Sequence, residues 1–138
     1  MPGRRIRITA GSVSADATLD DSATADAVWA ALPLAVAGQT WGDEIYFGIP
    51  VKAAAESPRE TVDMGDLAYW PPGSAFCIFF GPTPMSRGSE IRPASAVNVF
   101  GRIDGDARAF ARGALGDDGE GRARLIPPVS PPRPYSST

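Results

Sequence analysis

Segment 44–51 carries the two residues whose side chains are best suited to hold a ligand. Its sequence, Glu-Ile-Tyr-Phe-Gly-Ile-Pro-Val, is aromatic and β-branched and includes a proline near its end, which is typical of a β-strand. Alternation places three apolar side chains on one face, suited to a core: Ile45, Phe47 and Ile49. Glu44 and Tyr46 are then predicted on the outer face, where a carboxylate beside a phenol could hold a small ligand or a peptide. The alternative is that this face is simply exposed to solvent.

A proline-braced loop offers further candidate contacts. The loop Gly81-Pro-Thr-Pro-Met-Ser-Arg-Gly contains two prolines, so little conformational entropy would be lost when it binds a ligand. Four side chains in and after this loop are candidate ligand contacts: Thr83, Met85, Ser86 and Arg92. The alternative is that the loop only connects two strands.

Asn98 is a polar residue between two valines of an apolar segment. A buried amide needs hydrogen-bond partners. We therefore expect Asn98 either to pin the backbone of a loop, which is the favoured interpretation, or to point into a ligand groove.

Aromatic residues concentrate between residues 41 and 80. The functional interpretation is an apolar groove with polar tips, and the simpler one is a hydrophobic core. We expect most of the set to be core: Trp41, Tyr46, Phe47, Tyr69, Trp70, Phe76, Phe79 and Phe80.

The composition excludes several kinds of active site. The chain has no histidine and a single cysteine, Cys77. Histidine is the commonest general base and a common metal ligand, so we expect no His-dependent triad, no metal site and no cofactor. Cys77 lies in the apolar run 75–80 and is predicted to be buried and reduced. Asp63 and Asp66 flank a glycine turn and are predicted to make turn hydrogen bonds, so no catalytic residue is assigned.

The net charge and the first residues of the chain indicate which partners and which cellular location to expect. A net charge of −3 disfavours nucleic acid as a partner, because nucleic acid requires a basic face. No apolar run is long enough to span a membrane, and no signal peptide is visible at the start. We therefore expect a cytoplasmic protein that does not bind membranes.

A single mainly β domain must position these residues. Fifteen glycines and fourteen prolines among 138 residues make a helical bundle improbable. Short strands are predicted at 4–10, 13–19, 44–51, 61–62, 67–70, 75–80, 96–103 and 123–126, and the pattern turns extended after residues 34–39. Two short helices are predicted, at about 22–32 and 106–114. Residues 1–126 form the predicted domain, and 127–138 form a proline-rich tail.

Four stretches of this sequence point to a known family. They are Glu44-Ile-Tyr-Phe-Gly-Ile-Pro, Gly65-Asp66, Tyr69-Trp-Pro-Pro-Gly-Ser-Ala-Phe-Cys-Ile-Phe-Phe-Gly-Pro-Thr-Pro and Pro93-Ala-Ser-Ala-Val-Asn-Val-Phe-Gly-Arg-Ile. Over residues 4–126 the chain resembles the small prokaryotic cyclophilin-like family, whose function is largely unassigned. The resemblance implies a closed antiparallel β-barrel with helices at its ends.

True cyclophilins are peptidyl-prolyl isomerases, and the resemblance lets this activity be tested residue by residue. Their mechanism uses an arginine on a strand ending in Ile-Pro to polarise the prolyl amide. Aligned on Ile49-Pro50, that position falls at about Phe47, which cannot donate a hydrogen bond. The histidine near the proline ring is also missing. Isomerase activity is therefore not expected.

Three functional hypotheses follow. The favoured one is a non-catalytic barrel that binds a small molecule or a peptide. The second is a weak or altered prolyl isomerase. The third is a self-associating structural module, in which the tail 127–138 holds a homodimer together.

Overall fold

The computed structural model describes residues 4–11, 13–111 and 122–126 of the 138-residue chain. Within these residues nine strands form one sheet, in which every pairing is antiparallel. The strands are β1 (Arg5–Ala10), β2 (Val13–Leu19), β3 (Leu34–Ala37), β4 (Gln39–Thr40), β5 (Glu44–Gly48), β6 (Asp66–Trp70), β7 (Ala75–Phe79), β8 (Asn98–Ile103) and β9 (Arg122–Ile126). The predicted mainly β architecture is therefore confirmed.

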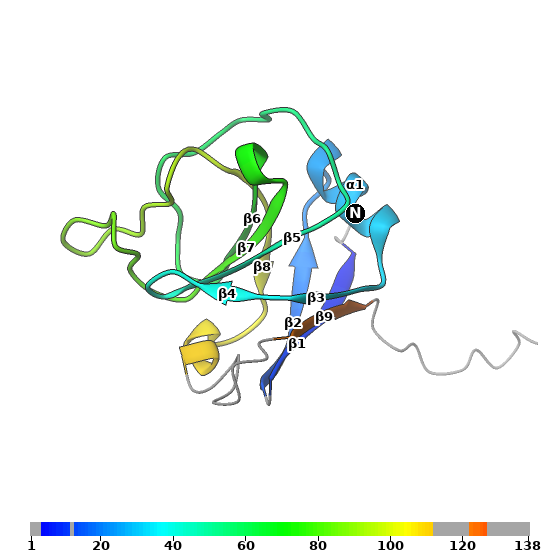
Figure 1. The fold of residues 1–138 in the computed structure, drawn as a ribbon, viewed down its shortest axis with the longest axis horizontal. Coiled ribbons are helices and arrows are strands. Elements are labelled where there is room, and N and C mark those ends of the chain that lie inside the picture. The colour runs from blue at the N-terminus through cyan, green and yellow to red at the C-terminus, as the bar shows by residue number, and fades with distance from the viewer. Residues whose placement is uncertain (1–3, 12, 112–121, 127–138) are drawn as a thin grey trace, which may run out of the picture.

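The order of strands explains the shape of the sheet. The order is β3-β9-β1-β2-β8-β6-β7-β5-β4, so the two edge strands, β3 and β4, follow one another in the chain. Only Gly38 separates them, and the sheet must curl strongly to bring its two edges so close. Figure 1 shows this curl, with β3 and β4 running in line across the front of the molecule.

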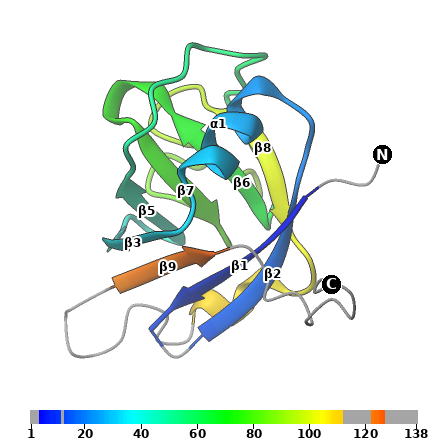
Figure 2. The same ribbon diagram turned by 90° about the vertical axis from the view of Figure 1, so that its right-hand side faces the viewer.

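Helical segments lie at the two ends of the curled sheet. The helix α1 (Ala23–Ala31) begins at Ser22, whose hydroxyl accepts a hydrogen bond from the Ala25 N–H at 3.0 Å. The 3-10 helix η2 (Ala107–Ala111) lies at the opposite end, as Figures 1 and 2 both show. The first helix agrees with the prediction for 22–32. The second is 3-10 over its described part, and residues 112–114 of that prediction lie outside the described residues.

The larger hydrophobic core fills the concave side of the sheet. Phe47 stacks on Phe76 with ring centroids 5.1 Å apart, and Phe100 meets Phe76 edge-on at 5.2 Å. Ile45, Phe47 and Ile49 all belong to this core, as alternation along the strand predicted. Side chains of α1 and η2 pack into the same core, so both helical segments cover its ends.

A second, smaller core lies on the convex side of β6 and β7. Cys77 and Phe79 point into it, whereas Phe76 and Ile78 point into the larger core. The prediction that this strand is buried on both faces, with Cys77 buried and free, is confirmed. Two segments cover the smaller core through isolated bridges, Arg59 with Val97 and Val62 with Ile91. The predicted strand at 61–62 is therefore one such bridge.

The tail and the length of the helices bear on oligomerisation and on membrane insertion. The tail 127–138 lies outside the described residues, so the structure does not test the alternative hypothesis that it holds a homodimer together. Among the described residues, no helix is both long enough and apolar enough to cross a membrane.

Candidate functional site

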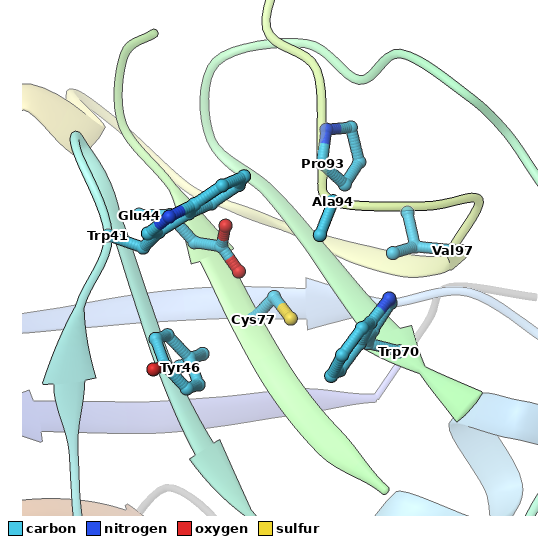
Figure 3. Close-up of a pocket in the computed structure, with 8 residues that line it drawn as sticks. All are labelled: Trp41, Glu44, Tyr46, Trp70, Cys77, Pro93, Ala94 and Val97. Carbon is cyan, nitrogen blue, oxygen red and sulfur yellow. The ribbon is translucent and has the colours of Figure 1, made fainter. Parts of the chain in front are cut away.

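A pocket of about 270 Å³ opens on the convex side of the sheet, beside the smaller core. Eight residues line it: Trp41, Glu44, Tyr46, Trp70, Cys77, Pro93, Ala94 and Val97. Figure 3 shows the Glu44 carboxyl group and the Cys77 thiol on its floor, with Trp41 and Trp70 on opposite sides. The lining is mostly apolar, and Glu44 is its one acidic residue.

The strand register brings the floor of the pocket together. In the pairing of β5 with β7, Tyr46 lies opposite Cys77, and Glu44 is two residues before Tyr46 on the same face. The pairing of β6 with β7 places Ala68 opposite Cys77, and Trp70 lies two residues after Ala68. Alternate residues of three neighbouring strands thus share one surface.

A tight turn before β5 holds Trp41 beside Glu44. The Trp41 N–H donates to the Glu44 carbonyl at 2.9 Å, and the Asp43 N–H donates to the Pro82 carbonyl at 2.9 Å. Gly42 has a φ of +61°, and a Cβ there would come within 2.7 Å of Pro84 Cδ. The turn therefore needs glycine both for its backbone conformation and for its contact with the following loop.

The Trp70 indole is fixed by two neighbours. Its Nε1–H donates to Ser95 Oγ at 2.7 Å, which joins the end of β6 to the segment that carries Pro93 and Ala94. A Cβ at Gly73 would lie 2.8 Å from the Trp70 ring, so the missing side chain lets the ring lie against the turn η1 (Pro71–Gly73). Trp70 therefore presents a defined side of its ring to the pocket.

The polar end of Tyr46 is also occupied. Its hydroxyl donates to Gln39 Oε1 on the edge strand β4 at 2.7 Å. Since Tyr46 and Trp70 both use their polar atoms outside the pocket, they contribute chiefly ring surface to it.

Glu44 is a carboxyl group held in apolar surroundings. The residue is 5% exposed. Burial raises the pKa of Glu44 from 4.5 to about 7, and the hydrogen bond from the Cys77 thiol offsets part of that rise. Burial, and then the nearby Glu44 charge, raise the pKa of Cys77 well above its ordinary value, so the thiol stays neutral. Near neutral pH, Glu44 can thus take up or release a proton.

The described residues supply no counter-ion for Glu44. Their ion pairs join arginines to other carboxylates, and none includes Glu44. No positive charge is among the causes that shift its pKa. Within the described part of the chain, no group of three or more acidic, cysteine or histidine side chains could hold a metal ion.

The loop candidates bond mainly within their own loop. Ser86 Oγ accepts hydrogen bonds from the Thr83 N–H at 2.9 Å and from the Arg92 N–H at 3.0 Å. Thr83 Oγ1 donates to the Arg92 carbonyl, and the Arg92 guanidinium pairs with Glu90 at 2.8 Å. Met85 is exposed. None of the four lines the pocket, and their role as ligand contacts stays a prediction.

Asn98 pins a loop backbone, in line with the favoured interpretation of the sequence. Its Oδ1 accepts from the Glu56 N–H at 2.8 Å, and its Nδ2 donates to the Ala54 carbonyl at 2.9 Å. Nδ2 also lies 3.2 Å from Thr24 Oγ1 at the start of α1. Glu56 accepts from both the N–H and the hydroxyl of Thr24, so one polar cluster ties the loop to β8 and α1.

Of the predicted site residues, the structure brings together Glu44 and Tyr46 at one pocket. Sequence reasoning did not select the remaining six lining residues: Trp41, Trp70, Cys77, Pro93, Ala94 and Val97. The cluster of aromatic residues between 41 and 80 was the available signal for the two tryptophans. Five members of that cluster are buried, as expected for a core: Phe47, Tyr69, Phe76, Phe79 and Phe80.

Comparison with known proteins identifies the family of this chain. The family described as cyclophilin-like matches residues 4–118. The chain belongs to the cyclophilin-like family. The hypothetical protein AF2241 from Archaeoglobus fulgidus, whose solution structure is known, is 36% identical, with a TM-score of 0.71 over 91% of this chain and 95% of that one.

A more distant structural likeness is to McbB, solved in complex with tryptophan. It is 14% identical, with a TM-score of 0.68 over 91% of this chain. The cyclophilin-like chain spans 45% of the McbB chain, and at this identity the likeness extends to the fold alone. A search of curated proteins found no match.

Proposed function

We propose that this cyclophilin-like protein binds a small organic molecule in the pocket around Glu44. The observation that carries the proposal is a buried carboxyl group without a counter-ion at the floor of a cavity with aromatic walls. Burial of a carboxyl group costs free energy, and natural chains retain such groups mainly where they serve a site. An apolar cavity with one polar anchor is the usual form of a small-molecule site.

The size of the cavity favours a small molecule over a peptide. A volume of about 270 Å³ is near the lower end of the range for ligand pockets. Pro93 and Ala94 form a wall at one side, where an extended peptide would need an open groove. We therefore expect a ligand with a single flat ring system.

The same residues argue against isomerase activity. No arginine lines the pocket, and Phe47, at the position expected for the arginine of true cyclophilins, is 2% exposed in the larger core. A binding role without isomerisation is thus better supported than the alternative of a weak isomerase.

The proposal is tested by a fragment screen followed by two-dimensional NMR of the ¹⁵N-labelled protein. Tryptophan is a sensible first probe, since McbB of the same fold was solved with it. We expect bound fragments to shift the amide resonances of Glu44, Trp70 and Val97. Shifts confined to other surfaces would contradict the proposal.

A matched pair of variants tests whether the ligand binds in the pocket around Glu44. Ala94 is exposed at the rim of the pocket, so Ala94→Phe should fill it without disturbing a core. Ala55→Phe is the control, because Ala55 is exposed and does not line the pocket. Binding should be lost in Ala94→Phe and retained in Ala55→Phe, and equal binding by both variants would overturn the proposal.

A second candidate function is acid–base catalysis by Glu44. A general acid or base works best when its pKa is near the working pH, and that of Glu44 is about 7. The test is to incubate a ligand found by the screen with the protein and follow it by NMR. Chemical conversion by the wild type that Glu44→Gln abolishes would support catalysis, and an unchanged ligand would support binding alone.

A further inference from the structure

The chemistry of the pocket lining restricts what it can recognise. Among its side chains, the Trp70 N–H and the Tyr46 hydroxyl are bonded to Ser95 and Gln39 outside the pocket. The Cys77 thiol is a weak donor and already hydrogen-bonds to Glu44, so the donors that remain are the Trp41 indole and, when it is protonated, the Glu44 carboxyl group. Once Glu44 is ionised, a negatively charged ligand would meet few donors here and a carboxylate of its own sign.

A positive charge, by contrast, meets complementary groups in this pocket. The Glu44 carboxylate would accept hydrogen bonds from an ammonium group and supply the missing counter-charge. The ring faces of Trp41, Trp70 and Tyr46 attract cations through their π electrons, most strongly where water is excluded. The remaining lining, Pro93, Ala94 and Val97, suits an apolar body.

We infer that the ligand of the Glu44 pocket is an organic cation, a protonated amine attached to a flat hydrophobic ring. This inference rests on the proposed function and specifies its ligand class. The amine lies against Glu44, and the ring lies between the aromatic side chains.

Proton balance gives this inference a pH signature. The pKa of Glu44 is about 7, so the carboxylate is mostly formed at pH 8 and mostly protonated at pH 6. A cation binds the carboxylate form, and its affinity should rise about tenfold from pH 6 to pH 8. The neighbouring ionisable groups should not change this pH dependence. Cys77 on β7 stays neutral, and Arg92, next to Pro93, is paired with Glu90 and Glu60.

Three probes of one shape test the charge preference: tryptamine, its neutral alcohol analogue tryptophol, and the anion indole-3-acetate. Affinities are measured by NMR titration of the pocket amides at pH 8. We expect tryptamine to bind at least about tenfold more tightly than tryptophol, and indole-3-acetate to bind most weakly. Equal binding of tryptamine and tryptophol would overturn the cation inference and leave the proposed function standing. Absence of pocket shifts with all three probes would overturn the inference as well, and failure of the wider fragment screen would overturn the proposed function.

Glu44→Gln separates the role of charge from that of shape. The variant should lose both the preference for tryptamine over tryptophol and the pH dependence of tryptamine binding. Glu60→Gln is the matched control, since the Glu60 side chain is 81% exposed and does not line the pocket. A Glu44→Gln protein that still prefers tryptamine tenfold would overturn the inference. Trp70→Phe, which keeps a ring but weakens its attraction for cations, should reduce the preference only in part.

Discussion

At the residue scale, one pocket combines a carboxyl group that titrates near neutral pH with a thiol that stays neutral there. Burial is the main cause that raises the pKa of both Glu44 and Cys77. Their contact raises the pKa of Cys77 further and lowers that of Glu44. A buried carboxyl group lowers the stability of the native state when it ionises.

The stability of the protein should fall as Glu44 ionises. Its pKa is raised from 4.5 to about 7 on folding, so between these values the native state holds a proton that the unfolded chain has lost. The stabilisation from this proton is complete below about pH 4.5 and is lost as the pH rises to about 7. The difference in unfolding free energy between Glu44→Gln and wild type should therefore change as the pH rises from 5 to 8. The change should be about 2–3 kcal/mol in favour of the variant.

Urea unfolding of the two proteins at both pH values measures this gain. Other titrating groups are common to both proteins and cancel in the difference. Glu60→Gln, which changes an exposed glutamate, should show no such pH-dependent gain. A constant difference between wild type and Glu44→Gln across this range would contradict the prediction.

Cys77 should react slowly with thiol reagents in the native protein. It is 2% exposed, and its raised pKa leaves little thiolate. We expect labelling by a chromogenic disulfide reagent to be at least about a hundredfold slower than in a urea-unfolded control. Similar rates in the two states would show that the smaller core opens readily.

At the element scale, the pocket depends on segments that are not strands. Segment 54–62 is tied to β8 by Asn98 and to segment 91–97 by the Arg59–Val97 and Val62–Ile91 bridges. Because Pro93, Ala94 and Val97 form one wall of the pocket, anything that releases segment 54–62 should also loosen that wall.

Asn98→Ala should test this connection. The change leaves the Glu56 N–H and the Ala54 carbonyl without their partner, and we expect a loss of about 2–4 kcal/mol in the unfolding free energy. Hydrogen exchange at the amides of Arg59 and Val97 should speed up more than at the amides of β1. Gln39→Ala removes an exposed amide and should cost at most about 1 kcal/mol. Equal losses in the two variants would contradict the role of Asn98.

At the scale of the whole molecule, the fold and the chemistry of its surface are separable. The chain has the cyclophilin-like fold, yet the strand position expected to carry arginine holds Phe47, which faces the larger core. The convex face of that strand carries Glu44 and Tyr46 instead. A shared fold therefore does not imply a shared reaction.

We accordingly predict no prolyl isomerase activity on standard proline peptides. Without an arginine at the position of Phe47 to polarise the prolyl amide, the barrier to rotation should not be lowered. A protease-coupled assay, with a true cyclophilin as positive control, measures this directly. Turnover within about tenfold of that control would mean that another residue replaces the missing arginine.

The sequence by itself determined seven of the nine strands (β1, β2 and β5 to β9), the first helix and the side of β5 that meets the core. These are properties of local pattern: alternation separated Ile45, Phe47 and Ile49 from Glu44 and Tyr46, and Ser22 and Pro33 bounded the helix. They could be predicted because the side-chain period of a strand or helix is fixed by the backbone itself.

Only the tertiary structure decided which residues share the pocket. Trp41, Cys77 and Val97 are at least twenty residues apart in the sequence. They meet with Trp70 because β6, β7 and β5 pair in one register and segment 91–97 folds over them. The raised pKa of Glu44 could not be predicted either, since it results from burial by parts of the chain that meet only in the fold. Local pattern fixes which face a side chain occupies, whereas the pairing of strands fixes its neighbours, and the chemistry of the pocket depends on the neighbours.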